Sequence, residues 1–137
     1  MMKAHDLRQS RMAEPSNMRI SFGTPLSSAE IFREMYRRLD DGARAAAMAT
    51  VVKTKGSTPQ QVGAKIVVFD DGSFIGTVGG GCVEADIYAI CRETLESGEM
   101  EIHEFNLNDD YAQADGMVCG GTMFVLIERW TPEDERI

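Results

Sequence analysis

The middle of the chain reads Gly76-Thr77-Val78-Gly79-Gly80-Gly81-Cys82-Val83-Glu84. Three consecutive glycines break regular structure, so a strand that leads into them must end there. Behind them, apolar residues recur at the spacing of one helical face as far as Gly98, which supplies a C-terminal stop. These residues are Val83, Ile87, Ile90, Cys91 and Leu95. A strand, a glycine turn and a helix over residues 82–97 are therefore predicted in that order.

Outward from this unit, one more helix and four more strands are predicted. Ser27 and Glu30 have the spacing of a capping box, apolar residues follow on one helical face, and Gly42 is the expected stop. The strand before the glycines covers 73–78, and the others cover 45–54, 65–69, 100–107 and 122–129. The sum predicts an α+β fold: a single compact domain with a small, mainly antiparallel or mixed sheet packed with two main helices.

The chain has 137 residues, of which 43% are hydrophobic, and this is enough for one domain and its core. Residues 1–25 show neither a helical nor an alternating period and are predicted to form a flexible N-terminal arm. The domain itself is expected over 26–131. Residues 132–137 are expected to form a polar tail.

Composition excludes several classes of function. A net charge of -8 and a pI near 4.7 leave no basic surface for a nucleic-acid partner. No apolar run approaches the roughly 20 residues of a membrane span, and no secretory signal is found at the N-terminus. Three cysteines are too few for a disulfide scaffold and suit a reducing compartment. A cytoplasmic protein that binds neither nucleic acid nor membrane is expected.

The turn before the second helix combines two chemical properties. Gly79, Gly80 and Gly81 lack side chains, so their backbone N–H groups can approach a ligand, and a helix N-terminus favours an anion. The same dipole favours the thiolate of Cys82, which would make it a metal ligand or a nucleophile. The structural alternative is a simple tight turn followed by a cysteine that packs as a small hydrophobic residue.

Two other stretches are candidates for the same site. Cys119 is also bracketed by glycines and precedes the last strand, so it could face Cys82 if the strands are neighbours. The loop from Gly56 onward offers the hydroxyls of Ser57 and Thr58 and the ammonium of Lys65 to an anionic or polar ring, or it is only a surface hairpin. The glycine and lysine spacings of nucleotide-binding loops are absent. A structural zinc site is not expected, because His5 and His103 are far from the cysteines in sequence.

The ordered set of motifs resembles the N-terminal domain of the XdhC/CoxI family. The pieces are Ala49-Thr50-Val51-Val52, Gly56-Ser57-Thr58-Pro59, Gly63-Ala64-Lys65, Asp71-Gly72, Gly76 to Glu84 and Cys119-Gly120-Gly121. Members of that family are described as maturation factors for xanthine dehydrogenase and related molybdenum hydroxylases. They hold molybdenum cofactor while a cysteine desulfurase adds the terminal sulfido ligand, and they pass it to the hydroxylase apoenzyme.

The resemblance implies roles for individual residues. Cys82 would contact the molybdenum centre, Gly79 to Gly81 would cradle the pterin or its phosphate, and Cys119 would be a second thiol near the site. Gln60 stands where family members commonly carry Arg. The usual family protein also continues into a Rossmann-like domain, so a separate Rossmann-domain chain or a homodimer is an expected partner.

Two further hypotheses compete with this cofactor chaperone, which is not an enzyme. In the first, Cys82 is the nucleophile of a thiol enzyme, the glycine amides bind an oxyanion, and His103 is the base. In the second, the chain is a structural partner within a larger maturation complex, with its cysteines inert in the core. We favour the chaperone, with no catalytic residue, because no histidine lies near either glycine-flanked cysteine in sequence.

Overall fold

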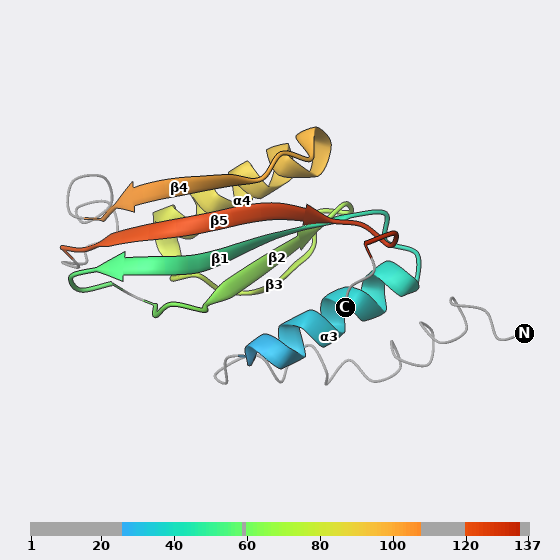
Figure 1. Ribbon diagram of the computed structural model, residues 1–137, viewed down its shortest axis with the longest axis horizontal. Helices are drawn as coiled ribbons and strands as arrows, with labels where there is room; N and C mark the ends of the chain where they lie inside the picture. The colour runs from blue at the N-terminus through green and yellow to red at the C-terminus, as the bar shows by residue number, and fades with distance from the viewer. Residues whose placement is uncertain (1–25, 59, 108–119, 135–137) are drawn as a thin grey trace, which may run out of the picture.

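The computed structural model describes residues 26–58, 60–107 and 120–134. The predicted arm over 1–25, Cys119 and the last residues of the predicted tail lie outside these ranges. The described elements, in chain order, are α3 (Ser28–Asp40), β1 (Ala46–Lys55), β2 (Lys65–Phe69), β3 (Phe74–Gly76), α4 (Gly81–Ser97), β4 (Glu101–Asn106) and β5 (Thr122–Trp130) (Figure 1).

The five strands form one sheet in the order β3-β2-β1-β5-β4, and every pairing between neighbours is antiparallel. The first strand therefore lies at the centre, and the last strand lies beside it. The predicted α+β domain with a mainly antiparallel sheet and two main helices is confirmed. Among the described residues, neither helix has the length and the apolar character that a membrane crossing requires.

The two helices cover opposite faces of the sheet, and each face has its own core (Figure 1). Because side chains alternate along a strand, neighbouring residues of β1 enter different cores. The core under α4 contains Ala47, Ala49, Val51, Ile66, Val68, Met123, Val125 and Ile127, with Val83, Ile87 and Cys91 of the helix. The core under α3 contains Ala46, Met48, Val67, Phe69 and Ile75, with Ile31, Met35 and Leu39. Burial on both faces explains why β1 begins with a continuous apolar run.

The start of α3 is the predicted capping box. Ser27 Oγ accepts a hydrogen bond of 3.1 Å from the Glu30 N–H, and Glu30 Oε1 accepts one of 2.8 Å from the Ser27 N–H. The two bonds satisfy donors that a helix otherwise leaves without a partner. The helix ends at Asp40, and Gly42 follows with a φ of 115°, in the place predicted for the stop.

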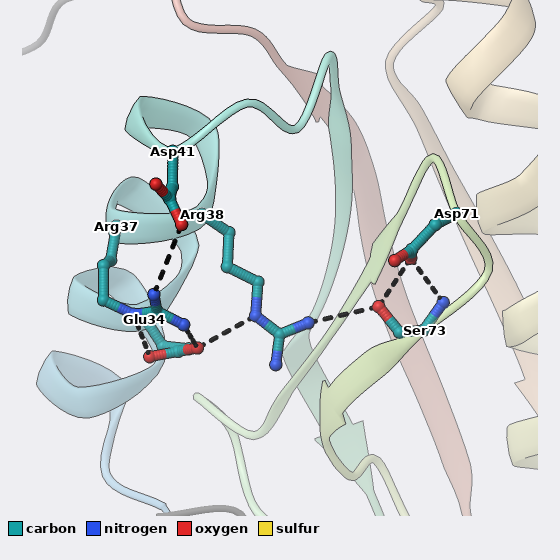
Figure 2. Close-up of polar contacts among 6 residues, drawn as sticks. All are labelled: Glu34, Arg37, Arg38, Asp41, Asp71 and Ser73. Carbon is teal, nitrogen blue, oxygen red and sulfur yellow. Dashed lines mark hydrogen bonds and ion pairs between the residues drawn. The ribbon is translucent and has the colours of Figure 1, made fainter. Parts of the chain in front are cut away.

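Polar side chains tie α3 to the turn between β2 and β3 (Figure 2). Glu34 accepts hydrogen bonds from both Arg37 and Arg38, and Arg38 also donates to Ser73 Oγ at 3.1 Å. Asp71 Oδ1 in turn accepts from the Ser73 hydroxyl and N–H. Burial raises the pKa of Glu34, but the hydrogen bonds and charges of the two arginines outweigh it, so its pKa is lowered overall. The helix and the turn are thus held as one unit.

Candidate functional site

Several loops meet at one end of the sheet, where β1 ends and β5 begins. Lys55 pairs there with Thr122, and α4 starts toward the same end (Figure 1). The backbone after β1 is packed tightly against the backbone before β5: a Cβ on Gly121 would lie 2.3 Å from the Ser57 carbonyl oxygen. Gly121 is thereby placed against the Ser57 loop, whereas Cys119, which was expected to face Cys82, lies outside the described residues.

The glycine run adopts a backbone that other residues rarely form. The φ angles of Gly76, Gly79, Gly80 and Gly81 are 84°, 136°, 78° and 67°. Residues with a Cβ are disfavoured in this region, which explains locally why the sequence uses glycine. At Gly76 the surroundings add a second reason, because a Cβ would lie 2.3 Å from the carbonyl oxygen of Lys65.

Glu84 holds the glycine turn together. Its Oε1 atom accepts hydrogen bonds from the Thr77 hydroxyl at 2.6 Å, from the Val78 N–H at 3.0 Å and from the Gly80 N–H at 3.1 Å. Thr77 Oγ1 also accepts from the Gly79 N–H at 3.2 Å. Of the amides that were expected to face an external anion, that of Gly80 is thus bonded to a carboxylate of the chain itself, and that of Gly79 to the Thr77 hydroxyl.

The sequence places Glu84 within the glycine motif but predicts no role for it. A signal was present, because a carboxylate in the first turn of a helix is attracted by the helix dipole and by nearby N–H groups. The direction in which the Glu84 side chain points could not be predicted from the sequence. Glu84 reaches back to the residues before the helix. The N-cap residue, Gly80, makes no side-chain cap hydrogen bond.

The helix α4 carries one exposed and one buried cysteine. Cys82 is the second residue of α4 and is exposed, whereas Cys91 is fully buried in the core under the helix. Burial raises the pKa of the Cys91 thiol to about 12, so this group is inert at neutral pH. The structural alternative, in which the cysteine after the glycines packs in the core, does not describe Cys82. In the described ranges, no cluster of three or more His, Cys, Asp or Glu side chains is arranged to hold a metal ion.

Lys65 and Cys82 belong to opposite faces of the sheet. Lys65 pairs with Thr50 and shares its face with the core under α3. Its ammonium donates to the Ser28 hydroxyl of α3 at 3.3 Å and to the Gly63 carbonyl at 3.0 Å. Burial lowers its pKa, which the charge of Glu128 partly opposes. The structure therefore does not bring Lys65 together with the exposed thiol.

The remaining candidates have partners of their own. The Thr58 hydroxyl donates to the Gln60 carbonyl at 2.8 Å, so the loop is closed by its own side chain. His103, the base required by the thiol-enzyme hypothesis, lies on β4 with its Nε2 atom 2.6 Å from Glu101 Oε1. A surface hollow of about 280 Å³ lies between α3 and residues 131–134, and no predicted site residue lines it.

The sequence of residues 39–106 matches the family model described as the XdhC and CoxI family. The matched segment contains the glycine run, Cys82 and Glu84. This chain belongs to the XdhC and CoxI family. The expectation drawn from the ordered motifs is therefore confirmed.

Two relatives and one solved structure that resemble this chain have names that refer to molybdenum enzymes. The chain is 31% identical over 108 residues to a probable subunit of xanthine dehydrogenase from Bacillus subtilis, covering 77% of this chain and 32% of that protein. It is 38% identical over 55 residues to the molybdenum cofactor insertion chaperone PaoD of Escherichia coli, covering 40% of this chain and 17% of PaoD. A crystal structure of a xanthine dehydrogenase from Bacillus halodurans matches 76% of this chain and 30% of its own chain, with a TM-score of 0.62 and 25% identity. The XdhC and CoxI family chain thus spans about a third or less of the length of each.

Proposed function

We propose that this chain holds molybdenum cofactor during the maturation of a molybdenum hydroxylase of the xanthine or CO dehydrogenase type. The proposal rests on family membership together with one structural observation, the exposed thiol of Cys82 in the first turn of α4. A soft thiolate is a suitable ligand for a metal centre that already carries sulfur ligands. The dipole of α4 favours that thiolate.

The glycine turn leaves the approach to the thiol free of side chains. Without side chains on Gly79, Gly80 and Gly81, a bulky ligand can approach the first turn of α4 closely. A pterin phosphate that reached the N–H groups of Val78 and Gly80 would have to displace the carboxylate of Glu84. For this reason we test the contact of the ligand with the thiol first. The glycines would cradle the phosphate only if the phosphate displaces the Glu84 carboxylate.

The residues of the polar loop from Ser57 to Lys65 differ in whether they can reach the proposed site. Ser57 lies against Gly121, and the segment that carries Cys119 leads into this contact, so these residues are candidates for the far side of the ligand. Lys65 faces α3 and would contribute only after its contacts with Ser28 and Gly63 were broken. The proposed ligand set therefore centres on Cys82 and Cys119.

The proposed partners follow from the same role. A chaperone of this type delivers its cargo to the apoenzyme of the hydroxylase, and it protects the cofactor while a cysteine desulfurase supplies the terminal sulfido ligand. A separate chain with a Rossmann-like domain would complete the arrangement usual in the family. The reducing conditions that keep Cys82 and Cys119 as thiols are those of the cytoplasm.

The test is the binding of anaerobically prepared molybdenum cofactor to the purified chain and to Cys82→Ala. We expect stoichiometric binding by the wild type and a loss of affinity of at least about tenfold in the variant, equivalent to about 1.4 kcal/mol. Cys91→Ala is the matched control, because it removes a thiol from the same helix but from the core, and circular dichroism shows whether it folds. Equal binding by wild type and Cys82→Ala would contradict the role of Cys82. Absence of binding by the wild type would contradict the proposal as a whole.

A further inference from the structure

One edge of the sheet is open and partly apolar. In the described part of the chain β4 has β5 on one side and no strand on the other. Leu107 donates its N–H to the Gly121 carbonyl, and hydrogen bonding alternates along an antiparallel pair, so the backbone groups of Ile102 and Glu104 point to the outer edge. Met100 and Ile102 are 66% and 64% exposed. Such an edge is a template for a further strand.

The face of the sheet beside this edge is also partly uncovered. Ile102 pairs with Leu126 of β5, and both side chains lie on the face of the sheet that α3 covers. The helix α3 packs against β2, on the other side of β1, and leaves the β4 end of this face open (Figure 1). Leu126 and its neighbour on this face, Phe124, are only half-buried. A segment that ran from the start of α3 to β4 would therefore cross apolar, accessible surface.

We propose that residues 18–22 of this chain pair with the outer edge of β4 as a sixth strand. They belong to the N-terminal arm, which shows no period over its full length. This short part of it, however, alternates apolar and polar residues and contains no proline, as a strand with one apolar face does. The apolar residues are Met18, Ile20 and Phe22, and the polar residues between them are Arg19 and Ser21. This inference does not rest on the cofactor-binding proposal, because it uses no residue of the glycine turn.

The arm is attached where it can reach this edge. Leu26, the first described residue after the arm, packs against the core under α3, and Ser28 contacts Lys65 at the start of β2. One row of paired residues crosses the sheet from there to β4, through Lys65, Thr50, Leu126 and Ile102. A strand beyond β4 would lie four strand spacings from β2, about 19 Å. The six residue steps from Phe22 to Ser28 span up to about 20 Å when extended, so the arm reaches β4 without a movement of α3.

Charge favours the arm over a second copy of the chain. The charged residues of the arm are Lys3, Arg8, Arg11 and Arg19 against Asp6 and Glu14. The arm therefore has a net charge of +2, and a net charge of -10 remains on the other 112 residues of a chain whose total is -8. The edge itself is acidic, because Glu99, Glu101 and Glu104 lie on or beside β4. A basic segment is attracted to this edge, whereas two copies of β4 would bring carboxylates together.

Only one orientation of the segment matches both kinds of side chain. When its apolar residues lie beside Ile102, on the α3 face, Arg19 points to the opposite face of the sheet, where Glu101 and His103 lie. Glu101 is 48% exposed on that face, within reach of a long basic side chain. A slip by one residue would turn Arg19 toward Ile102 and the apolar residues toward Glu101. The side chains thus select the face of the segment that packs on the sheet.

The experiment is amide hydrogen exchange of the full chain. We expect the N–H groups of Ile102 and Glu104 to be protected in the wild type and to exchange at least about tenfold faster in Ile20→Asp. Leu7→Asp is the matched control, because it makes the same change in the arm outside the segment, and it should exchange like the wild type. Val125, in the interior of the sheet, should exchange equally slowly in all three proteins, which shows that the domain stays folded. Unprotected amides of Ile102 and Glu104 in the wild type would overturn the proposal, as would undiminished protection in Ile20→Asp.

A concentration series and a charge exchange identify the occupant of the edge. Pairing within one chain does not depend on protein concentration, so protection that rises with concentration would place another molecule on β4 and contradict the proposal. Arg19→Glu and Glu101→Lys should each accelerate exchange at Ile102 and Glu104 about threefold or more, because like charges then lie side by side. The double variant should recover the protection of the wild type. A double variant that exchanges as fast as the single variants would contradict the pairing of Arg19 with Glu101.

Discussion

The two helices begin in different ways, although both carry a glutamate near the first turn. At α3, Glu30 closes a capping box with Ser27, three residues earlier, and both hydrogen bonds lie at the exposed start of the helix itself. At α4, no side chain caps the helix, and Glu84 instead reaches back to Thr77, Val78 and Gly80. The first glutamate completes a helix, and the second organises the loop that precedes one.

The two helix starts also differ in the backbone that precedes them. A capping box can be placed at any helix that needs its N–H groups satisfied. The start of α4 uses three consecutive glycines with positive φ, keeps the Cys82 thiol exposed and buries Val78 just before the turn. Such a turn loses more conformational entropy on folding than a simple cap does, and it leaves the backbone free of side chains at these positions.

The largest expected effect comes from Gly76→Ala. The new Cβ would meet the Lys65 carbonyl oxygen at 2.3 Å in a backbone region that alanine disfavours, so we expect a loss of about 3 kcal/mol in the free energy of unfolding. Gly63→Ala is the control, because its φ is 102° but no atom lies within 4 Å of the Cβ, and it should cost about 1 kcal/mol. Urea denaturation measures both. Equal losses would mean that the clash is relieved by movement of the strand.

Glu84→Ala should cost about 2 kcal/mol of stability, because three donors in a partly buried turn lose a charged acceptor. The matched change at the other helix, Glu30→Ala, removes one exposed bond and should cost about 0.5 kcal/mol. Hydrogen exchange at Val78 and Gly80 should accelerate in Glu84→Ala, and the alkylation rate of Cys82 should change with it. Unchanged exchange at both amides would show that Glu84 does not hold the turn.

The buried cysteine of α4 gives a pH-dependent prediction. Cys91 has its pKa raised to about 12 by burial, whereas in the unfolded chain the thiol titrates near 8.5. The folded state therefore keeps its full contribution below about pH 8.5 and loses it as the pH rises toward 12, by about 1.4 kcal/mol per pH unit at most. Comparing the wild type with Cys91→Ala between pH 8 and 10.5 isolates this slope. Parallel curves for the two proteins would contradict it.

The smallest expected effect is that of Ser27→Ala, which removes the cap of α3. The Glu30 N–H loses its acceptor at the exposed helix start, and we expect a loss of about 1 kcal/mol. Ser27→Thr keeps the hydroxyl and should recover most of it. Thermal unfolding of the three proteins tests the order, and a threonine variant as unstable as the alanine variant would count against the capping role.

Much of the fold was predictable, because its signals are local. The capping box, the apolar run of β2 with the turn residues after it, and the glycine stops set the element boundaries within one or two residues of those in the structure. The apolar face of α4 was less exact: Thr94 is buried where Leu95 was expected, and Leu95 is only partly buried, because the helix face toward the sheet is turned slightly from the predicted one.

The candidate site was harder to predict, because it depends on contacts between distant segments. The separation of Lys65 from Cys82 could not be predicted without the strand register, since one residue along β2 decides which face a side chain enters. The role of Glu84 required the direction of its side chain, which spacing does not give. The exposure of Cys82 also came only from the structure, since the same sequence fits a buried helix position equally well.

The central place of β1 has a consequence for synthesis. β1 pairs with β5 from Ala46 opposite Trp130 to Lys55 opposite Thr122, so its second neighbour is the last of the five strands to leave the ribosome. Contacts so distant in sequence slow folding, because a long loop must close before they form. Until β5 emerges, the apolar edge of β1 stays open to other strands. We therefore expect the nascent domain to depend on protection by general chaperones until this strand is released.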